Sequence, residues 1–127
     1  MRLVEYLLNQ TSDTSGDSVD VFEAPIFGRL CGVAVVDGDL ANDFDITLTY
    51  VNSGIGTITL LTLTDLSADA MYYPREQVCG NTGAGLDYND ESDEPVAEPP
   101  IIAGYVTSTL ADGGATKTGA VILYVWE

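Results

Sequence analysis

The sequence predicts an all-β protein: one antiparallel β-sandwich or barrel of about seven or eight strands with long acidic loops. Three observations predict it. Apolar residues alternate with threonine and other polar residues along most of the chain. Turns rich in glycine and aspartate separate these runs, and no helical apolar stripe exceeds about two turns. The 127 residues, 46% of them hydrophobic, suit a single domain spanning residues 1–127.

The clearest element is a β-hairpin in the middle of the chain. Residues 43–51 alternate large apolar side chains with aspartate and threonine, the pattern of a strand with one buried face and one wet face. Asn52-Ser53-Gly54 is a turn signal, and residues 55–63 are again rich in threonine, isoleucine and leucine. The two runs are therefore expected to pair.

The remaining strands follow from the same alternation. A second hairpin, between residues 104–110 and 119–126, is expected to close the chain, because Ala111 to Gly114 has turn chemistry. One short helical turn is expected within residues 65–71. The other strands are expected at residues 2–8, 18–24, 30–36, 72–79, 101–110 and 119–126.

Two stretches are expected to lie outside the sheets. Residues 10–18 are small and polar, which is typical of a mobile loop. Residues 87–100 combine six acidic side chains with Pro95, Pro99 and Pro100. Proline and crowded like charge exclude a central strand there, so an exposed acidic excursion is expected.

The charge excludes two classes of partner. Twenty acidic residues face four basic ones, a formal net charge of −16. Such a chain is repelled by phosphate backbones, so neither nucleic acid nor an anionic membrane is an expected partner. No apolar run reaches the length of a membrane span. Two interpretations of the charge stay open: solubility, or a specific basic protein surface.

Catalysis is not expected. The chain has no histidine, which removes Ser-His-Asp and Cys-His nucleophile pairs. A pair of carboxylates working as acid and base needs an apolar cleft, whereas these acids lie in polar turns. Cys31 and Cys79 are too few for a four-ligand zinc site. The first residues lack a secretory-signal pattern, so two buried reduced thiols are favoured over a disulfide.

Calcium is the one cofactor that the sequence brings into consideration. Asp37, Asp39, Asp43 and Asp45 place four carboxylates in one short stretch, and Ca²⁺ prefers clustered oxygen ligands. The spacing is not that of an EF-hand loop. Acidic turns are also common on so acidic a chain, which favours plain solvation as the explanation.

A candidate interface lies at Tyr72, Tyr73 and Arg75. Tyrosine and arginine are enriched where proteins bind each other, because they give a large contact area at low entropic cost. The alternative is that one tyrosine packs in the core and that Arg75 pairs locally with a surplus carboxylate.

The C-terminal half carries a resemblance to a known class of proteins. Tyr72-Tyr73-Pro74-Arg75 is followed by Val78, Gly83, Leu86-Asp87-Tyr88, Pro95-Val96, Glu98-Pro99, Ala103-Gly104, Gly113-Gly114, Lys117-Thr118-Gly119 and Val121-Ile122-Leu123-Tyr124-Val125. This order resembles small virion proteins of tailed bacteriophages. The likeness covers roughly the last 55 residues and the threonine-rich hairpin, through residues that shape a fold rather than a catalytic site.

The resemblance implies a virion structural protein. The form it favours is a decoration (cement) protein on the outside of the capsid, made in the host cytoplasm and bound to the major capsid protein or other virion proteins. Homo-oligomers, with trimers as one form, are implied as well. A head–tail or tail component is one alternative, and a Ca²⁺-dependent module binding carbohydrate or a host surface is another.

Overall fold

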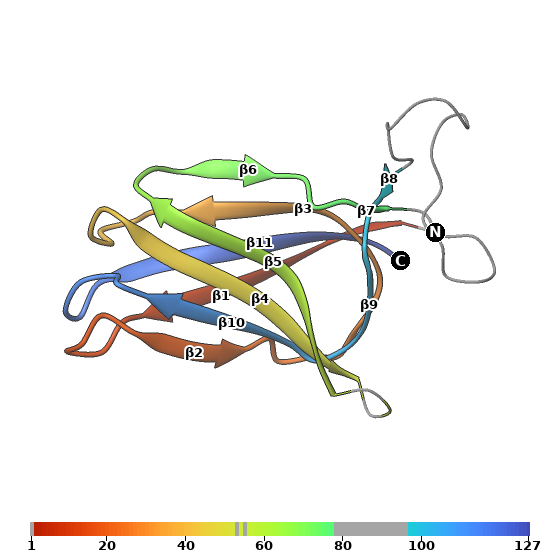
Figure 1. The fold of residues 1–127 in the computed structure, drawn as a ribbon, viewed down its shortest axis with the longest axis horizontal. Helices are drawn as coiled ribbons and strands as arrows, with labels where there is room; N and C mark the ends of the chain where they lie inside the picture. The colour runs from red at the N-terminus through yellow and green to blue at the C-terminus, as the bar shows by residue number, and fades with distance from the viewer. Residues whose placement is uncertain (1, 53, 55, 78–96) are drawn as a thin grey trace.

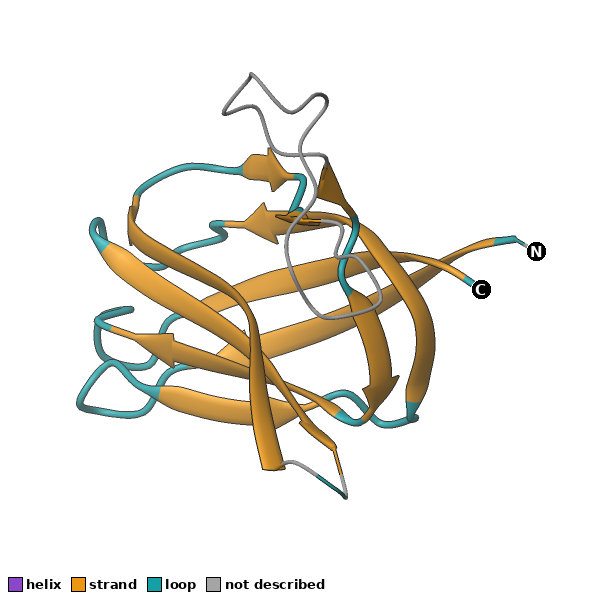
Figure 2. Ribbon diagram, turned by 45° about the vertical axis from the view of Figure 1, so that its right-hand side comes forward, coloured by secondary structure: helices purple, strands orange, loops and turns teal. Residues whose placement is uncertain are grey.

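The structure is a computed structural model and describes residues 2–52, 54, 56–77 and 97–127 (Figure 1). In this part of the chain it contains eleven β-strands and no helix (Figure 2). Accordingly, the described residues include no helix able to span a membrane. Two antiparallel sheets pack face to face as a single β-sandwich, which confirms the all-β prediction and excludes a closed barrel.

Sheet A has β1, β11 and β3 side by side, and two short strands share the far edge of β3. Its strands are β1 (Leu3–Thr11), β11 (Thr118–Trp126), β3 (Ile26–Val36), β6 (Ala70–Tyr72) and β9 (Ile101–Gly104). Sheet B runs in the order β2 (Ser18–Val21), β10 (Val106–Ala111), β4 (Phe44–Asn52) and β5 (Gly56–Leu66). A separate pair joins β7 (Glu76–Gln77) to β8 (Ala97–Glu98).

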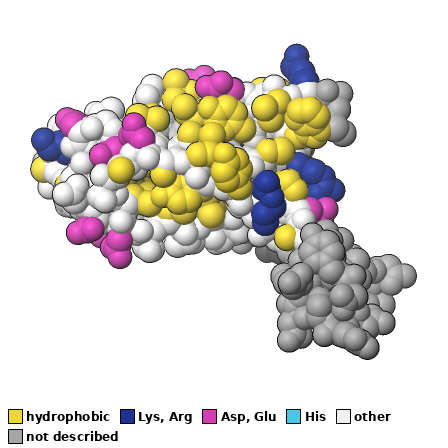
Figure 3. All heavy atoms as spheres, turned by 90° about the horizontal axis from the view of Figure 1, so that it is seen from above, with side chains coloured by type: hydrophobic (Ala, Val, Ile, Leu, Met, Phe, Trp, Pro, Cys, Tyr) yellow, Lys and Arg dark blue, Asp and Glu magenta, His cyan; other side chains and the backbone are white. Residues whose placement is uncertain are grey.

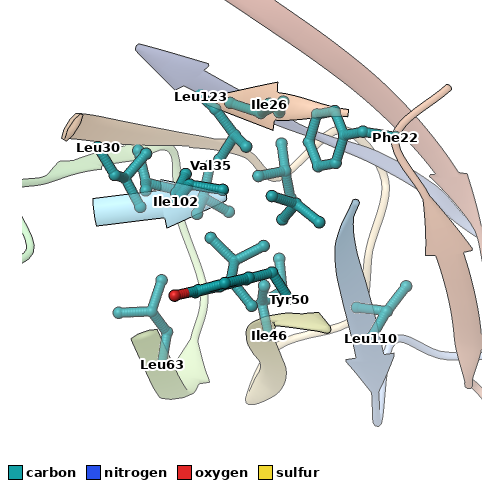
Figure 4. Close-up of a cluster of buried hydrophobic side chains, with 14 of the residues drawn as sticks. Phe22, Ile26, Leu30, Val35, Ile46, Tyr50, Leu63, Ile102, Leu110 and Leu123 are labelled. Carbon is teal, nitrogen blue, oxygen red and sulfur yellow. The ribbon is translucent and has the colours of Figure 1, made fainter. Parts of the chain in front are cut away.

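The core lies between the two sheets. Every second residue of β11 is buried from Gly119 to Val125, and every second residue of β10 from Val106 to Leu110. Figure 4 shows how side chains from both sheets meet, among them Leu123 of β11, Ile46 of β4 and Phe22. Burying one face of each strand fixes which residues point outward.

The predicted central hairpin is confirmed. β4 and β5 pair antiparallel from Asn52 opposite Gly56 to Phe44 opposite Leu66. A register shift between Leu48 and Thr49 leaves Leu60 as an extra residue on β5. The helical turn expected at residues 65–71 is wrong, because β5 continues through Leu66 and β6 begins at Ala70.

The strand expected at residues 101–110 is two strands in different sheets. β9 pairs with β3 in sheet A, and β10 pairs with β4 in sheet B. Gly104 makes the crossing, with φ at +150°. A Cβ atom there would lie 2.7 Å from the Val51 carbonyl oxygen, so only glycine fits. The predicted hairpin of residues 104–110 with 119–126 is therefore wrong: β11 lies in sheet A, between β1 and β3.

Other strand bounds also differ from the expectation. The strand expected at residues 72–79 is split, because β6 ends at Tyr72, Pro74 follows, and β7 belongs to another pair. Residues 78 and 79 lie outside the described residues, as does most of the acidic excursion at 87–100, of which 97–100 are described. β2 ends at Val21, and β3 begins earlier than expected, at Ile26.

Gln10 belongs to the core rather than to the loop expected at residues 10–18. β1 runs through Thr11, and Gln10 is only 2% exposed. Its Nε2 donates a hydrogen bond to the Ser108 carbonyl oxygen at 3.0 Å, and Ser108 Oγ donates back to Gln10 Oε1 at 2.7 Å. Asp20 on β2 accepts from both Gln10 Nε2 and Ser18 Oγ. This polar bridge joins sheet A to sheet B.

The bridge gives a test of what holds the sheets in register. Ser108→Ala leaves Gln10 Oε1 buried without a donor and should lower the free energy of unfolding by about 1–3 kcal/mol. Adding Gln10→Met removes the orphaned acceptor and should recover part of that loss. Urea denaturation of the single and double variants measures both values. A double variant less stable than Ser108→Ala would contradict this account.

Candidate functional site

The outer face of sheet A is built from paired residues of its five strands. Antiparallel partners point to the same side, so the register places side chains from different strands in rows. One row is Leu3, Trp126, Arg29 and Ile101, and another is Leu7, Ile122, Ala34 and Met71. A third row, Glu5, Tyr124 and Gly32, lies between them.

Most of these side chains are apolar and open to solvent. Leu7 is 59% exposed and Met71 42%, and Tyr73, just after β6, is 65% exposed. Figure 3 shows hydrophobic side chains in a continuous band on this face, with most of the visible basic side chains toward the right-hand end. We call this surface the apolar outer face; its residues are Leu3, Leu7, Met71, Tyr73, Ile101, Ile122, Tyr124 and Trp126.

A shallow hollow of about 250 Å³ lies within the apolar outer face. Leu3, Met71, Tyr73 and Tyr124 line it, together with Gly32 and the half-buried Cys31. Cys31 is a free thiol whose Sγ lies 3.5 Å from the Arg29 carbonyl oxygen. Two buried thiols were expected. Cys31 is half-buried, and Cys79 lies outside the described residues.

All three arginines belong to this side of the molecule, although the chain has only four basic residues. Arg2 directly precedes β1, and Arg29 lies in the row that holds Trp126. Arg29 pairs with Glu98 at 3.0 Å, which is the ion pair found among the described residues. The exposed Arg75 donates from Nη1 to the Cys31 carbonyl at 3.3 Å and to the Pro74 carbonyl at 2.6 Å.

This combination of side chains is suited to binding a protein surface. Tyrosine, tryptophan, methionine and arginine are the residues enriched in protein interfaces. A contiguous exposed apolar patch on a chain that is otherwise strongly charged marks an interaction site rather than ordinary surface.

The three predicted interface residues do not all lie on the same surface. Tyr73 and Arg75 lie on the apolar outer face or at its margin. Tyr72 is opposite Val33 on the inner side and packs against the core, which is the alternative that the sequence left open for one tyrosine.

Sequence reasoning missed most of this face, although a signal for it existed. Residues 119–126 contain no polar side chain between Gly119 and Trp126 except the Tyr124 hydroxyl. An uninterrupted apolar run in a strand indicates that both faces are apolar. The inner residues fill the core, and Ile122, Tyr124 and Trp126 are left for the outer face.

The predicted calcium ligands lie at one end of the sandwich, where the turns after β1, β3, β5 and β10 gather (Figure 1). Two of the four carboxylates accept hydrogen bonds from the backbone, whereas Asp37 Oδ1 is buried without a hydrogen-bond partner among the described residues. Asp39 Oδ1 accepts from the Thr118 N–H at 2.6 Å, and Asp45 Oδ1 accepts from the Asp65 N–H at 2.9 Å. Asp43 has φ of +66°, a conformation that aspartate tolerates better than most residues.

The carboxylates of neighbouring aspartates also accept hydrogen bonds from backbone N–H groups. Asp69 Oδ1 accepts from the Asp37 N–H at 2.7 Å. Asp13 Oδ1 accepts from the N–H groups of Ser15 at 2.8 Å and Asp17 at 3.0 Å. Within the described residues, no three acidic or cysteine side chains, Asp37, Asp39, Asp43 and Asp45 included, form a group suited to a metal ion. Backbone capping thus explains why these turns use aspartate, and calcium binding stays a prediction.

Comparisons with known proteins give only distant likenesses of fold. No protein-family model matches the sequence, and no curated protein matches it. Among solved structures, the crystal structure of PirA is similar over 94% of this chain and 93% of that one, at 12% identity and a TM-score of 0.47.

Two structures from infectious bursal disease virus are also similar. The Gx strain matches at 12% identity with a TM-score of 0.40, over 98% of this chain and 32% of that one. The VP2 subviral particle matches at 13% identity with a TM-score of 0.36. The chain spans about a third of the length of these viral chains. Likenesses at this level transfer no function to the chain.

The capping role of the aspartates predicts how the protein responds to calcium. Millimolar CaCl₂ should raise the melting temperature no more than the same concentration of MgCl₂, and chelator should not lower it, because the described carboxylates form no group suited to a metal ion and those of Asp39 and Asp45 already accept backbone hydrogen bonds. Differential scanning fluorimetry measures the shift. A rise specific to calcium that Asp39→Asn abolishes would instead establish a calcium site in residues 37–45.

Asp13 predicts one component of acid sensitivity. Hydrogen bonds from the Asp17 and Ser15 N–H groups hold the pKa of Asp13 below its ordinary value. The charged form therefore stabilises the fold above the ordinary pKa of about 3.9, and this contribution is lost as pH falls through the lower folded value. Asp13→Asn keeps an acceptor but cannot titrate. The difference in melting temperature between wild type and Asp13→Asn should be constant above about pH 5 and change below about pH 4; a difference independent of pH would refute this.

Proposed function

We propose that the protein is a structural component of a virus particle, a decoration protein on the outer surface of the head. In this proposal the apolar outer face of sheet A binds the shell protein, and the domain has no catalytic role. The carrying observation is that exposed Leu3, Met71, Tyr73 and Trp126 share one sheet face with the chain's arginines. The resemblance of the C-terminal half to tailed-phage virion proteins supports the same assignment.

The charge distribution supports docking by this face. A chain of net charge −16 is repelled by acidic surfaces, so docking is favoured where the chain presents positive charge. Arg2, Arg29 and Arg75 give the apolar outer face the only concentration of positive charge in the described chain. The partner expected there presents apolar side chains flanked by carboxylates or carbonyl groups.

The rest of the described surface supports an outward orientation. The aspartate-rich turns lie at one end of the sandwich, away from the arginines, and remain in solvent in such a complex. Exposed carboxylates keep finished particles apart. A small individual contact is sufficient, because many copies on a regular lattice add avidity to a weak individual affinity.

The first test is whether the chain is in the particle and through which face it binds. Met71→Glu puts a charge in the apolar outer face at a side chain that is already 42% exposed, so folding should be retained. Val19→Glu is the matched control, because Val19 is 67% exposed on the outer face of sheet B. Binding of each purified variant to particles that lack the protein is measured by co-sedimentation and quantitative mass spectrometry.

We expect Met71→Glu to weaken particle binding by at least about tenfold, equivalent to about 1.4 kcal/mol, with Val19→Glu near wild type. Arg75→Ala should weaken it by a smaller factor. Electron cryomicroscopy of the decorated heads should show regular density for this domain. Absence of the chain from purified particles would refute the virion assignment. Unchanged binding of Met71→Glu to particles that lack the protein would retain the virion assignment and reject the apolar outer face as the docking surface.

A further inference from the structure

β5 is a long edge strand without a charged residue or a proline in residues 56–64. It pairs with β4 on one side and with no described strand on the other. Charged residues and proline are two of the features by which edge strands avoid pairing with another chain. The row of N–H and C=O groups on its open side is therefore a template for a further strand.

The other edges of the sandwich differ from β5 in this respect. β1 carries Glu5 in mid-strand, and β2 is four residues long and contains Asp20. β6 and β9, which share the remaining edge of sheet A, have three and four residues. The chain is strongly acidic, yet this nine-residue stretch on an open edge carries no charge. We therefore expect another strand to pair with it.

The sequence of β5 is close to a palindrome. Residues 57–64 read Thr-Ile-Thr-Leu-Leu-Thr-Leu-Thr, and the reverse order differs only by exchange of isoleucine and leucine. If two copies pair antiparallel about a two-fold axis between Leu60 and Leu61, like residues meet. The pairs are Thr57 with Thr64, Ile58 with Leu63, Thr59 with Thr62, and Leu60 with Leu61.

The fold keeps this symmetry in three dimensions. Thr59 and Thr62 are three positions apart and would point to opposite faces of a regular strand. The register shift at Leu60 restores them to the same face: Thr59 is opposite Thr49, and Thr62 is opposite Thr47. Ile58 and Leu63 both turn toward the core. Residues that meet in the symmetric pairing therefore lie on the same side of the sheet, as antiparallel partners must.

The electrostatics also permit two copies to meet here. The rows of the outer face that adjoin β5 consist of threonines: Thr47 and Thr49 on β4, and Thr107 and Thr109 on β10. Asp65, the first charged residue after the stretch, would lie opposite Gly56 of the other copy. Two strongly acidic chains thus join without placing carboxylates against each other.

We propose that β5 pairs with β5 of a second copy of this chain, antiparallel and about a two-fold axis between Leu60 and Leu61. The dimer joins two four-stranded sheets into one continuous sheet of eight, in the order β2-β10-β4-β5-β5-β4-β10-β2. The contact is isologous, so it closes at two copies. It is independent of what the apolar outer face binds, and it is tested on the purified protein without any particle.

The test uses charges placed at the paired positions. Thr59→Glu with Thr62→Glu puts a carboxylate opposite a carboxylate twice in the dimer, whereas Thr59→Glu with Thr62→Lys puts opposite charges together. Thr107→Glu with Thr109→Glu is the control, since it adds the same two charges to the same sheet face, two strands from the edge. Sedimentation velocity up to about 1 mM protein gives the dissociation constant, and circular dichroism confirms folding.

We expect wild type, the Glu/Lys variant and the control to form dimers, and the Glu/Glu variant to dissociate at least about tenfold more readily. A folded wild type that is monomeric up to about 1 mM would overturn the proposal. So would a trimer, or a dimer that the Glu/Glu variant leaves intact.

A disulfide test then reports the register itself. In a chain with Cys31 and Cys79 replaced by serine, Thr59→Cys mixed with Thr62→Cys should crosslink under mild oxidation, because opposite Cα atoms lie about 4.5–5.5 Å apart. Neither variant alone should crosslink, since like positions would be about 10 Å apart in this register. Crosslinking of Thr59→Cys with itself, to the same extent as in the mixture, would overturn the stated axis.

Discussion

Packing of the two inner faces against each other decides the side on which every residue of the sandwich lies. Leu48 of sheet B and Leu123 of sheet A are fully buried, and successive residues of a strand point to opposite faces. A slip of one residue would bring these side chains into water and carry Thr47 or Ile122 into the core. The buried bridge between Gln10 and Ser108 reinforces the same alignment, since both groups lose their partners if either sheet shifts. The outer surfaces are therefore consequences of the core.

Three surfaces of different chemistry result from this alignment. The outer face of sheet A combines apolar and aromatic residues with arginine, and the outer face of sheet B is formed largely by threonine. The turns at one end hold aspartates whose carboxylates cap backbone N–H groups. Few carboxylates lie at the two places where a partner is proposed. The apolar outer face has Glu5 in its middle row and Glu98 paired with Arg29, and the edge at β5 has no charged residue between Gly56 and Thr64. Where the charges lie therefore says more about the binding surfaces than the net charge does.

The elements that the sequence predicted well are local ones. The hairpin of β4 and β5 follows from alternation on either side of a short turn, and both strands were identified within a few residues. Errors arose where distant segments decide the outcome. Nothing within residues 101–110 tells that the chain leaves sheet A at Gly104, because the reason is the approach of the Val51 carbonyl oxygen from β4. Gln10 looked like a loop residue because its partner, Ser108, lies at the other end of the sequence.

By itself the sequence determined the all-β class, the acidic character, the central hairpin and the aspartate turns, because these depend on composition and on neighbours within a few positions. It also contained the near-palindrome of β5, which has no meaning until the strand is known to form an edge. Only the tertiary structure decided that Tyr73 faces solvent while Tyr72 packs inward, and that Leu3, Met71 and Trp126 share one surface. The physical reason is that a face of a sheet is assembled sideways, across hydrogen-bonded strands far apart in the chain, whereas a sequence pattern reports only along one strand.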